Sequence, residues 1–168
     1  MNTKEIFNKF LILTSIISFA SGCSPVLFPV NVSIPIDISK EGSIAESEFN
    51  LWRDDQYEIE LEFISLSNFA PNDKKLIDYL GGIINRTSGV TIPVQVIIAK
   101  INNENEIVVL NKEFQTKGIS SVGEKFIIRN VTMIRLNSGK YKIKIINKNS
   151  NNELREIRVN LIIHYFRR

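Results

Sequence analysis

Alternation of apolar and polar residues with a period of two is the feature that most constrains this chain. It is clearest at residues 57–63, where Tyr, Ile, Leu and Phe alternate with three glutamates. Successive side chains of a strand point to opposite faces, so this pattern predicts a strand with one face in a core and the other in solvent. Residues 32–38 repeat the period, and Pro35 favours an edge position there.

Further apolar runs follow, separated by segments rich in Asn, Ser and Gly. Short strands at such spacing predict a mainly β fold, an antiparallel sandwich of about seven strands. The runs are residues 92–101, 106–114, 125–136, 140–147 and 154–165, and a less regular one spans 44–52.

One short helix is expected at residues 72–80, inserted between two strands. Asn72 or Asp73 can cap its first turn, and Gly81-Gly82 can end it. A helix of this length is unstable alone, so it must pack on the sandwich.

The turn at residues 136–141, Leu-Asn-Ser-Gly-Lys-Tyr, resembles the turn-and-tyrosine element of immunoglobulin-like domains. In those domains a tyrosine of the penultimate strand donates a hydrogen bond back to the preceding connection. The resemblance implies an immunoglobulin-like β-sandwich and a structural role for Tyr141.

The first 22 residues have the order of an export signal. Lys4 and Lys9 precede an apolar run at residues 10–19, which is too short to span a bilayer, and small residues then lead into Cys23, the single cysteine. This order resembles the bacterial lipobox, although Ala20 stands where that pattern usually has Leu. The resemblance implies cleavage between Gly22 and Cys23 and a lipid on Cys23. The alternative is a core helix with an incidental thiol.

These interpretations divide the chain into a cleaved signal peptide at residues 1–22, a lipidated tether at 23–30 and a β-sandwich domain at 31–168. The net charge of +3 is too small to predict binding to nucleic acid or electrostatic attachment to a membrane. Attachment must come from the lipid. Ser24 stands where an aspartate would resemble an inner-membrane retention signal, so we expect the outer membrane of the bacterial envelope, facing the periplasm.

Residues 38–165 resemble a family of bacterial lipoprotein and periplasmic domains known only as a domain of unknown function. The matching features are Gly42 before a strand, the strand at 57–63, Leu80-Gly81-Gly82, Ile92-Pro93-Val94 and the turn at 138–141. The resemblance implies no particular activity.

Residues that could carry chemistry are few. A hydrolase of the Ser, His and acid type needs an imidazole beside its nucleophile, and the one histidine, His164, stands in the last strand, where we expect an exposed or hydrogen-bonded side chain. Asp54-Asp55 and Glu58 lack the Asp-x-Asp-x-Asp-Gly pattern of a calcium loop. We therefore expect no enzymatic activity, no cofactor and no metal ion.

The glutamates at 58, 60 and 62 invite comparison with the paired carboxylates of glycoside hydrolases. A solvated strand face explains them more simply, and Lys140, Lys142 and Lys144 form a basic counterpart. Our hypothesis is that both rows point outward, so that replacing Glu60 and Glu62 by Lys leaves the melting temperature nearly unchanged.

Two segments are candidates for a binding interface. Trp52 and Arg53 are of the residue types enriched in binding hot spots, although a single Trp in a small sandwich is more often part of the core. Asn85 and Arg86 lie in the long connection between residues 67 and 92, and loops on a rigid sandwich commonly carry recognition.

Together these features predict a membrane-anchored periplasmic lipoprotein that acts as a non-catalytic protein-binding module. Its expected partners are the membrane, through the lipid on Cys23, and a protein that the residues do not identify. Nucleic acid is not among them. Two alternatives stay open: an immunity lipoprotein that neutralises a secreted toxin such as a phospholipase effector, and a lipoprotein of envelope assembly or maintenance.

Overall fold

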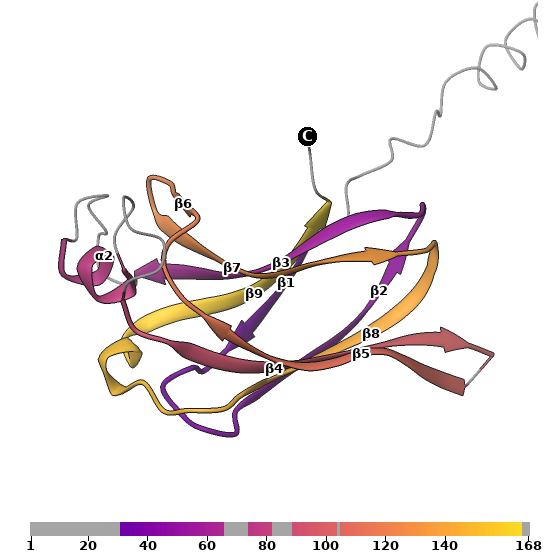
Figure 1. The fold of residues 1–168 in the computed structure, drawn as a ribbon, viewed down its shortest axis with the longest axis horizontal. Coiled ribbons are helices and arrows are strands. Elements are labelled where there is room, and N and C mark those ends of the chain that lie inside the picture. The colour runs from indigo at the N-terminus through magenta and orange to yellow at the C-terminus, as the bar shows by residue number, and fades with distance from the viewer. Residues whose placement is uncertain (1–30, 66–73, 82–88, 104, 166–168) are drawn as a thin grey trace, which may run out of the picture.

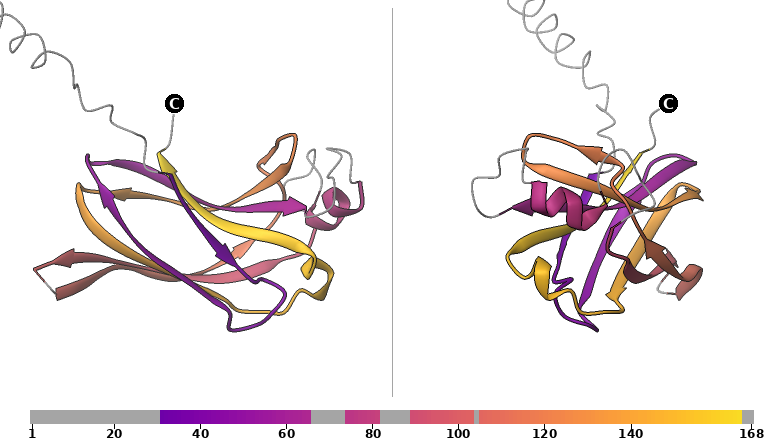
Figure 2. Two further views of the ribbon diagram at one scale, coloured as in Figure 1. Left: turned by 180° about the vertical axis from the view of Figure 1, so that it is seen from behind. Right: turned by 60° about the vertical axis from the view of Figure 1, so that its left-hand side comes forward.

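The computed structural model describes residues 31–65, 74–81, 89–103 and 105–165. Two antiparallel sheets pack face to face in this part of the chain (Figure 1, Figure 2). The elements in chain order are β1 (Asn31–Ile36), β2 (Ile44–Leu51), β3 (Asp55–Ser65), α2 (Lys74–Leu80), β4 (Ile92–Asn102), β5 (Asn105–Thr116), β6 (Ser121–Val122), β7 (Phe126–Leu136), β8 (Gly139–Asn147), the 3-10 turn η1 (Asn152–Leu154) and β9 (Ile157–Tyr165).

The expected mainly β sandwich with one short helix is confirmed. The five-stranded sheet has the order β1-β9-β3-β7-β6, and the four-stranded sheet has the order β2-β8-β4-β5. The predicted helix is α2, and Leu76 and Leu80 pack it onto the core. Its expected caps, Asn72 and Asp73, lie outside the described residues. No helix of the described ranges has the length and apolar character that crossing a membrane requires.

The strand order differs from the immunoglobulin-like order that the tyrosine turn implied. In an immunoglobulin domain the first two strands pair within one sheet, whereas here β1 and β2 lie in different sheets and β1 pairs with β9. The connections β1–β2, β2–β3, β3–β4, β7–β8 and β8–β9 all cross from one sheet to the other. This is the arrangement of a jelly roll. The turn around Tyr141 is a local motif that either connectivity can contain, so it did not distinguish them.

The core is formed by the inward-facing half of each alternating strand. Ile59, Leu61 and Phe63 of β3 are fully buried, as are Val96 and Ile98 of β4 on the opposite sheet. Each such side chain contributes roughly 1.5–3 kcal/mol when it leaves water. The period of two therefore identified the faces of the strands correctly.

Two tyrosines fix one end of the sandwich. The Tyr141 hydroxyl donates to the main-chain carbonyl of Asn137, with 2.9 Å between the oxygens, which confirms the structural role expected for Tyr141. The Tyr57 hydroxyl donates in the same way to the carbonyl of Arg53, at 3.0 Å. Because both tyrosines are buried, each one holds the connection that precedes its strand against the core.

The opposite end is held by Arg129, a fully buried side chain that points inward from β7. Its guanidinium donates to the main-chain carbonyls of Leu80, Val90, Thr116 and Gly118. Burial lowers the pKa of Arg129 to about 10, so the group stays charged at neutral pH. One side chain thus joins β7 to the end of α2, the entry to β4 and the exit from β5.

We expect Arg129→Met to lower the free energy of unfolding by about 3 kcal/mol or more, because it leaves several buried carbonyls without a donor. Urea denaturation followed by circular dichroism measures the loss. Arg135→Met on the same strand is the control, since Arg135 is exposed and its replacement should cost little. Equal losses for the two variants would contradict this role for Arg129.

Candidate functional site

One end of the sandwich gathers several segments from across the chain, and we call it the Trp52 end. It consists of the β2–β3 connection at residues 52–54, the β7–β8 connection at 137–138 and the tip of the β4–β5 hairpin. The strand registers bring them together, since Leu51 lies opposite Gly139, and Ile101 lies opposite Lys140. Asn31, the first residue of β1, pairs with His164 near the end of β9, so the start of β1 and the end of β9 also lie here.

Trp52 itself is exposed, with 73% of its surface accessible. The expectation that it is more often a core residue is therefore wrong for this chain. Its neighbour Leu51 is the last residue of β2 and is buried, whereas Trp52 follows in a bend, where the strand alternation no longer directs side chains inward. A large aromatic side chain consequently projects into solvent.

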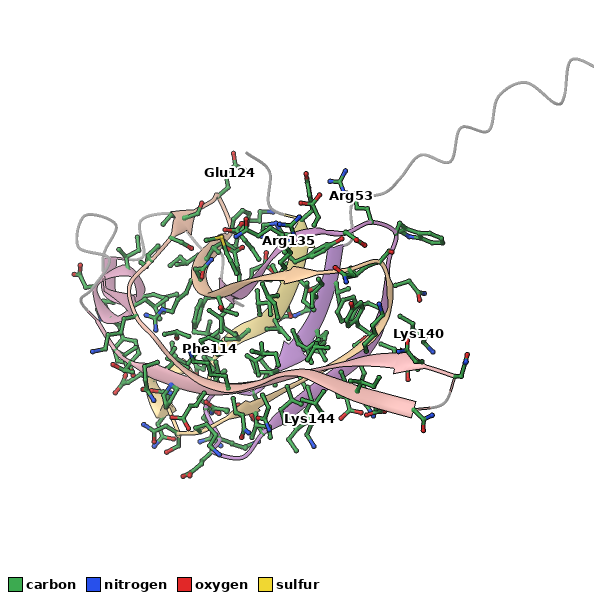
Figure 3. The ribbon with its side chains drawn as sticks, turned by 45° about the vertical axis from the view of Figure 1, so that its right-hand side comes forward. Arg53, Phe114, Glu124, Arg135, Lys140 and Lys144 are labelled. Atoms are coloured by element: carbon green, nitrogen blue, oxygen red, sulfur yellow. The ribbon has the colours of Figure 1, made fainter. Side chains whose placement is uncertain are left out.

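The segment that carries Trp52 is held by several contacts. The Arg53 guanidinium lies 3.8 Å from the centre of the Tyr165 ring, and its Nε atom is 3.2 Å from a carboxylate oxygen of Asp55. Asp54 accepts a hydrogen bond of 2.6 Å from the main-chain N–H of Ser138, which joins the two connections of this end. Arg53 extends outward at the top of the view in Figure 3. Trp52 is thus presented on a fixed connection.

The hairpin of β4 and β5 adds a second apolar surface to this end. It projects beyond the other strands (Figure 1), and β5 is an edge strand of the four-stranded sheet. Ile107, Val108 and Val109 on β5 are exposed by 53%, 59% and 44%. The register shifts opposite Ile98 and Ala99, which leaves Val109 without a residue across from it, as in a β-bulge. An edge strand with apolar side chains on both faces is a surface on which another chain can pair.

A different cluster forms on the outer face of the five-stranded sheet. β9 lies between β1 and β3, and this places His164 directly across from Glu58. The Nε2 atom of His164 is 2.8 Å from Oε2 of Glu60 and 3.7 Å from Oε2 of Glu58. Ligand atoms of the three side chains all lie within 4.8 Å of one another. The side chains are 34%, 19% and 12% exposed for His164, Glu58 and Glu60, respectively. We call them the acid–histidine cluster.

The solvated glutamate face that we expected is only partly present. The three glutamates do point away from the core, but Glu60 as a residue is only 9% exposed, and Glu62 accepts a hydrogen bond of 3.0 Å from the amide of Asn160. Glu60 is therefore not a freely solvated side chain, and the effect of replacing Glu60 and Glu62 by Lys on the melting temperature stays a prediction. Burial raises the pKa of the Glu58 carboxyl, the charge of Glu60 raises it further, and His164 opposes both.

The lysine row of β8 belongs to the other sheet, so it does not form ion pairs with the glutamates of β3. Lys140 pairs with Glu48 of β2, and Lys142 pairs with Glu46 of β2 and Glu106 of β5. Figure 3 shows Lys140 and Lys144 on the side of this four-stranded sheet. These exposed pairs stabilise the domain little and mainly favour this register.

The remaining sequence candidates fall elsewhere. Asp54 and Asp55, considered with Glu58 for calcium, are bound to Ser138 and Arg53 instead. The main-chain N–H of Ser138 lowers the pKa of Asp54. Asn85, Arg86, Gly22 and Cys23, together with the predicted signal peptide and tether, lie outside the described residues.

Residues 33–165 match the family described as "Domain of unknown function (DUF5625)". A crystal structure of a protein from Sulfurospirillum deleyianum aligns with 83% of this chain and 99% of its own, with a TM-score of 0.72 and 24% identity, and has the same fold. A family 35 carbohydrate-binding module from Clostridium thermocellum aligns with 82% of this chain and 92% of its own, with a TM-score of 0.40 and 10% identity. The likeness to that module is too distant to bear on function. No curated protein matches the chain.

Trp52 is the one tryptophan of the sequence, so its fluorescence reports on the Trp52 end alone. We expect acrylamide to quench the native protein nearly as strongly as the protein unfolded in guanidinium, because the indole is already in water. Stern–Volmer plots of both states measure this. Strong protection of the native indole would contradict the exposed position.

Proposed function

This chain belongs to the DUF5625 family, a family of unknown function, and from its own surface we propose that it is a non-catalytic protein-binding module, held by a lipid at the outer membrane and facing the periplasm. The Trp52 end carries the proposal. Trp52 and the apolar residues of β5 are exposed at the same end of a rigid sandwich. Exposed apolar surface of this kind marks interaction sites in soluble domains.

The partner that fits this end is a protein with an extended segment. β5 offers an unpaired strand edge to which such a segment can add by main-chain hydrogen bonds, and Ile107, Val108 and Val109 give it side chains to contact on both faces. Trp52 stands at the far side of the four-stranded sheet, three strand spacings or about 14 Å from β5. A partner that covers both would span the four-stranded sheet, with Trp52 as an anchor.

The proposed anchor would bring this end close to the membrane. β1 begins at Asn31 at the Trp52 end, and the residues between Cys23 and Asn31 span at most about 25 Å when extended. A lipid on Cys23 therefore keeps Trp52 and β5 near the bilayer surface. The partner is then a protein that works at that surface.

Both finer alternatives are compatible with such a partner. An immunity lipoprotein would meet a toxin that attacks the membrane, such as a phospholipase effector. An assembly or maintenance lipoprotein would meet a resident envelope protein. A partner that is toxic when expressed alone favours the first, and an envelope defect on deletion, without a dedicated toxin, favours the second.

We expect Cys23→Ser to release the protein from the membrane fraction, because it removes the residue that carries the lipid. Fractionation of cells that express the full chain, with metabolic labelling by a palmitate analogue, measures this. Ser24→Ala, one residue further on, is the control and should stay labelled. A Cys23→Ser protein that remains in the membrane fraction would contradict lipid anchoring.

We expect Val108→Asp to reduce recovery of the partner at least tenfold, since a charge on the strand edge must be desolvated when another strand pairs with it. The full chain is purified from membranes after crosslinking, and the amount of each captured protein is compared by mass spectrometry. Ile44→Asp is the matched control, because Ile44 is similarly exposed, at 54% against 59% for Val108, and lies near the other end of the sandwich. Equal recovery with both variants would contradict binding through β5.

A further inference from the structure

The acid–histidine cluster has no place in the proposed protein interface, and we propose that Glu58, Glu60 and His164 bind a divalent transition-metal ion, for which zinc is the best fit. An imidazole nitrogen and two carboxylate oxygens form a ligand set that suits zinc. Calcium fits less well, because it prefers six to eight oxygen ligands.

The ligand atoms are close enough to share one zinc ion. Bonds of about 2.0–2.2 Å in a tetrahedron place neighbouring ligand atoms about 3.3–3.6 Å apart. The distances from His164 Nε2 to the oxygens of Glu60 and Glu58, 2.8 Å and 3.7 Å, lie on either side of that range. Small rotations of the two glutamate side chains would bring the three ligand atoms to these separations, since all three already lie within 4.8 Å of one another. Because His164 is about one-third exposed, a fourth position stays open to water or to an external ligand.

The hydrogen bond at the other nitrogen of His164 favours a metal ligand. Nδ1 is 3.2 Å from the main-chain carbonyl oxygen of Tyr165, which can only accept, so Nδ1 carries the hydrogen. Nε2 is then the nitrogen that faces the Glu60 carboxylate, at 2.8 Å, and it is the nitrogen that an ion bound by both side chains would use. Histidines that bind metals are commonly oriented by this kind of bond from the second nitrogen to a carbonyl.

The second carboxylate favours a metal ion, because one ligand atom each of Glu58, Glu60 and His164 converge within 4.8 Å of one another, as ligands of a shared ion must.

The third glutamate of β3 is bound to a neighbour on the same sheet face. Asn160 of β9 lies directly across from Glu62, and its amide nitrogen donates a hydrogen bond to the Glu62 carboxylate. Its Oδ1 atom is buried and has no hydrogen-bond partner within the described residues. Glu62 is therefore bound outside the cluster, which leaves Glu58 and Glu60 as the carboxylates beside His164.

The test uses the full chain, purified with an affinity tag that contains no histidine and stripped of metal with a chelator. Isothermal titration with zinc chloride should give one ion per chain, and Co²⁺ in place of zinc should give the visible absorption of a four-coordinate site. His164→Ala and Glu60→Gln should each lower the zinc affinity at least about tenfold. Glu46→Gln, which removes an exposed carboxylate on the other sheet, should leave it unchanged.

Thermal melts of each variant confirm that it is folded, and Glu60→Gln keeps the shape of the side chain if His164→Ala does not fold. Zinc binding that persists in a folded Glu60→Gln protein, or its absence from the stripped parent chain, would overturn the proposal and leave a plain histidine–glutamate ion pair. Val108→Asp should bind zinc normally, so the metal site and the protein interface are tested separately.

Discussion

The pairing of β9 with β1 on one side and with β3 on the other is the constraint on which most of this domain depends. It joins the first strand of the sandwich to the last and completes the larger sheet. The same insertion buries Leu161 and Ile163 in the core and sets His164 beside Glu58 and Glu60. Without it β1 would have no partner in the larger sheet, and the acid–histidine cluster would not exist.

The sequence predicts the class of fold well because the period of two is a property of single strands. This period predicts which face of β3 or β4 is buried, and the buried residues of both strands agree with the prediction. The period does not predict which strands are neighbours, since many strand orders bury the same faces. Tyr141 illustrates the limit: its hydrogen bond was predicted from a local resemblance, but the strand order inferred from it was not observed. Arg129 also occupies an inward position of its strand, yet its four carbonyl partners come from distant segments that no local pattern connects.

The candidate site was less predictable for the same reason. His164 and Glu60 are 104 positions apart in the chain and meet only through the register of β3 and β9. A row of glutamates at alternate positions is typical of a solvated face, and only knowledge of the adjacent strand shows that a histidine faces this row. The prediction for Trp52 was wrong for another reason. Its residue type favoured a buried position, whereas its location, one residue after the end of β2, determines its exposure.

The position of β9 also governs when the domain can form. Residues of β1 pair with residues of β9 more than a hundred positions later. When the chain is made from its N-terminus onward, Ile34 and Ile36 therefore have no pairing partners until nearly the whole domain has been made. Folds dominated by such distant contacts acquire native structure slowly, and their incomplete forms expose strand edges that can pair with other chains. β1 and β3 are two such edges here, and both are protected by the arrival of a single strand. Completion of folding is thus a late event, and the time between the appearance of β1 and that of β9 is the period in which this chain most needs protection from aggregation.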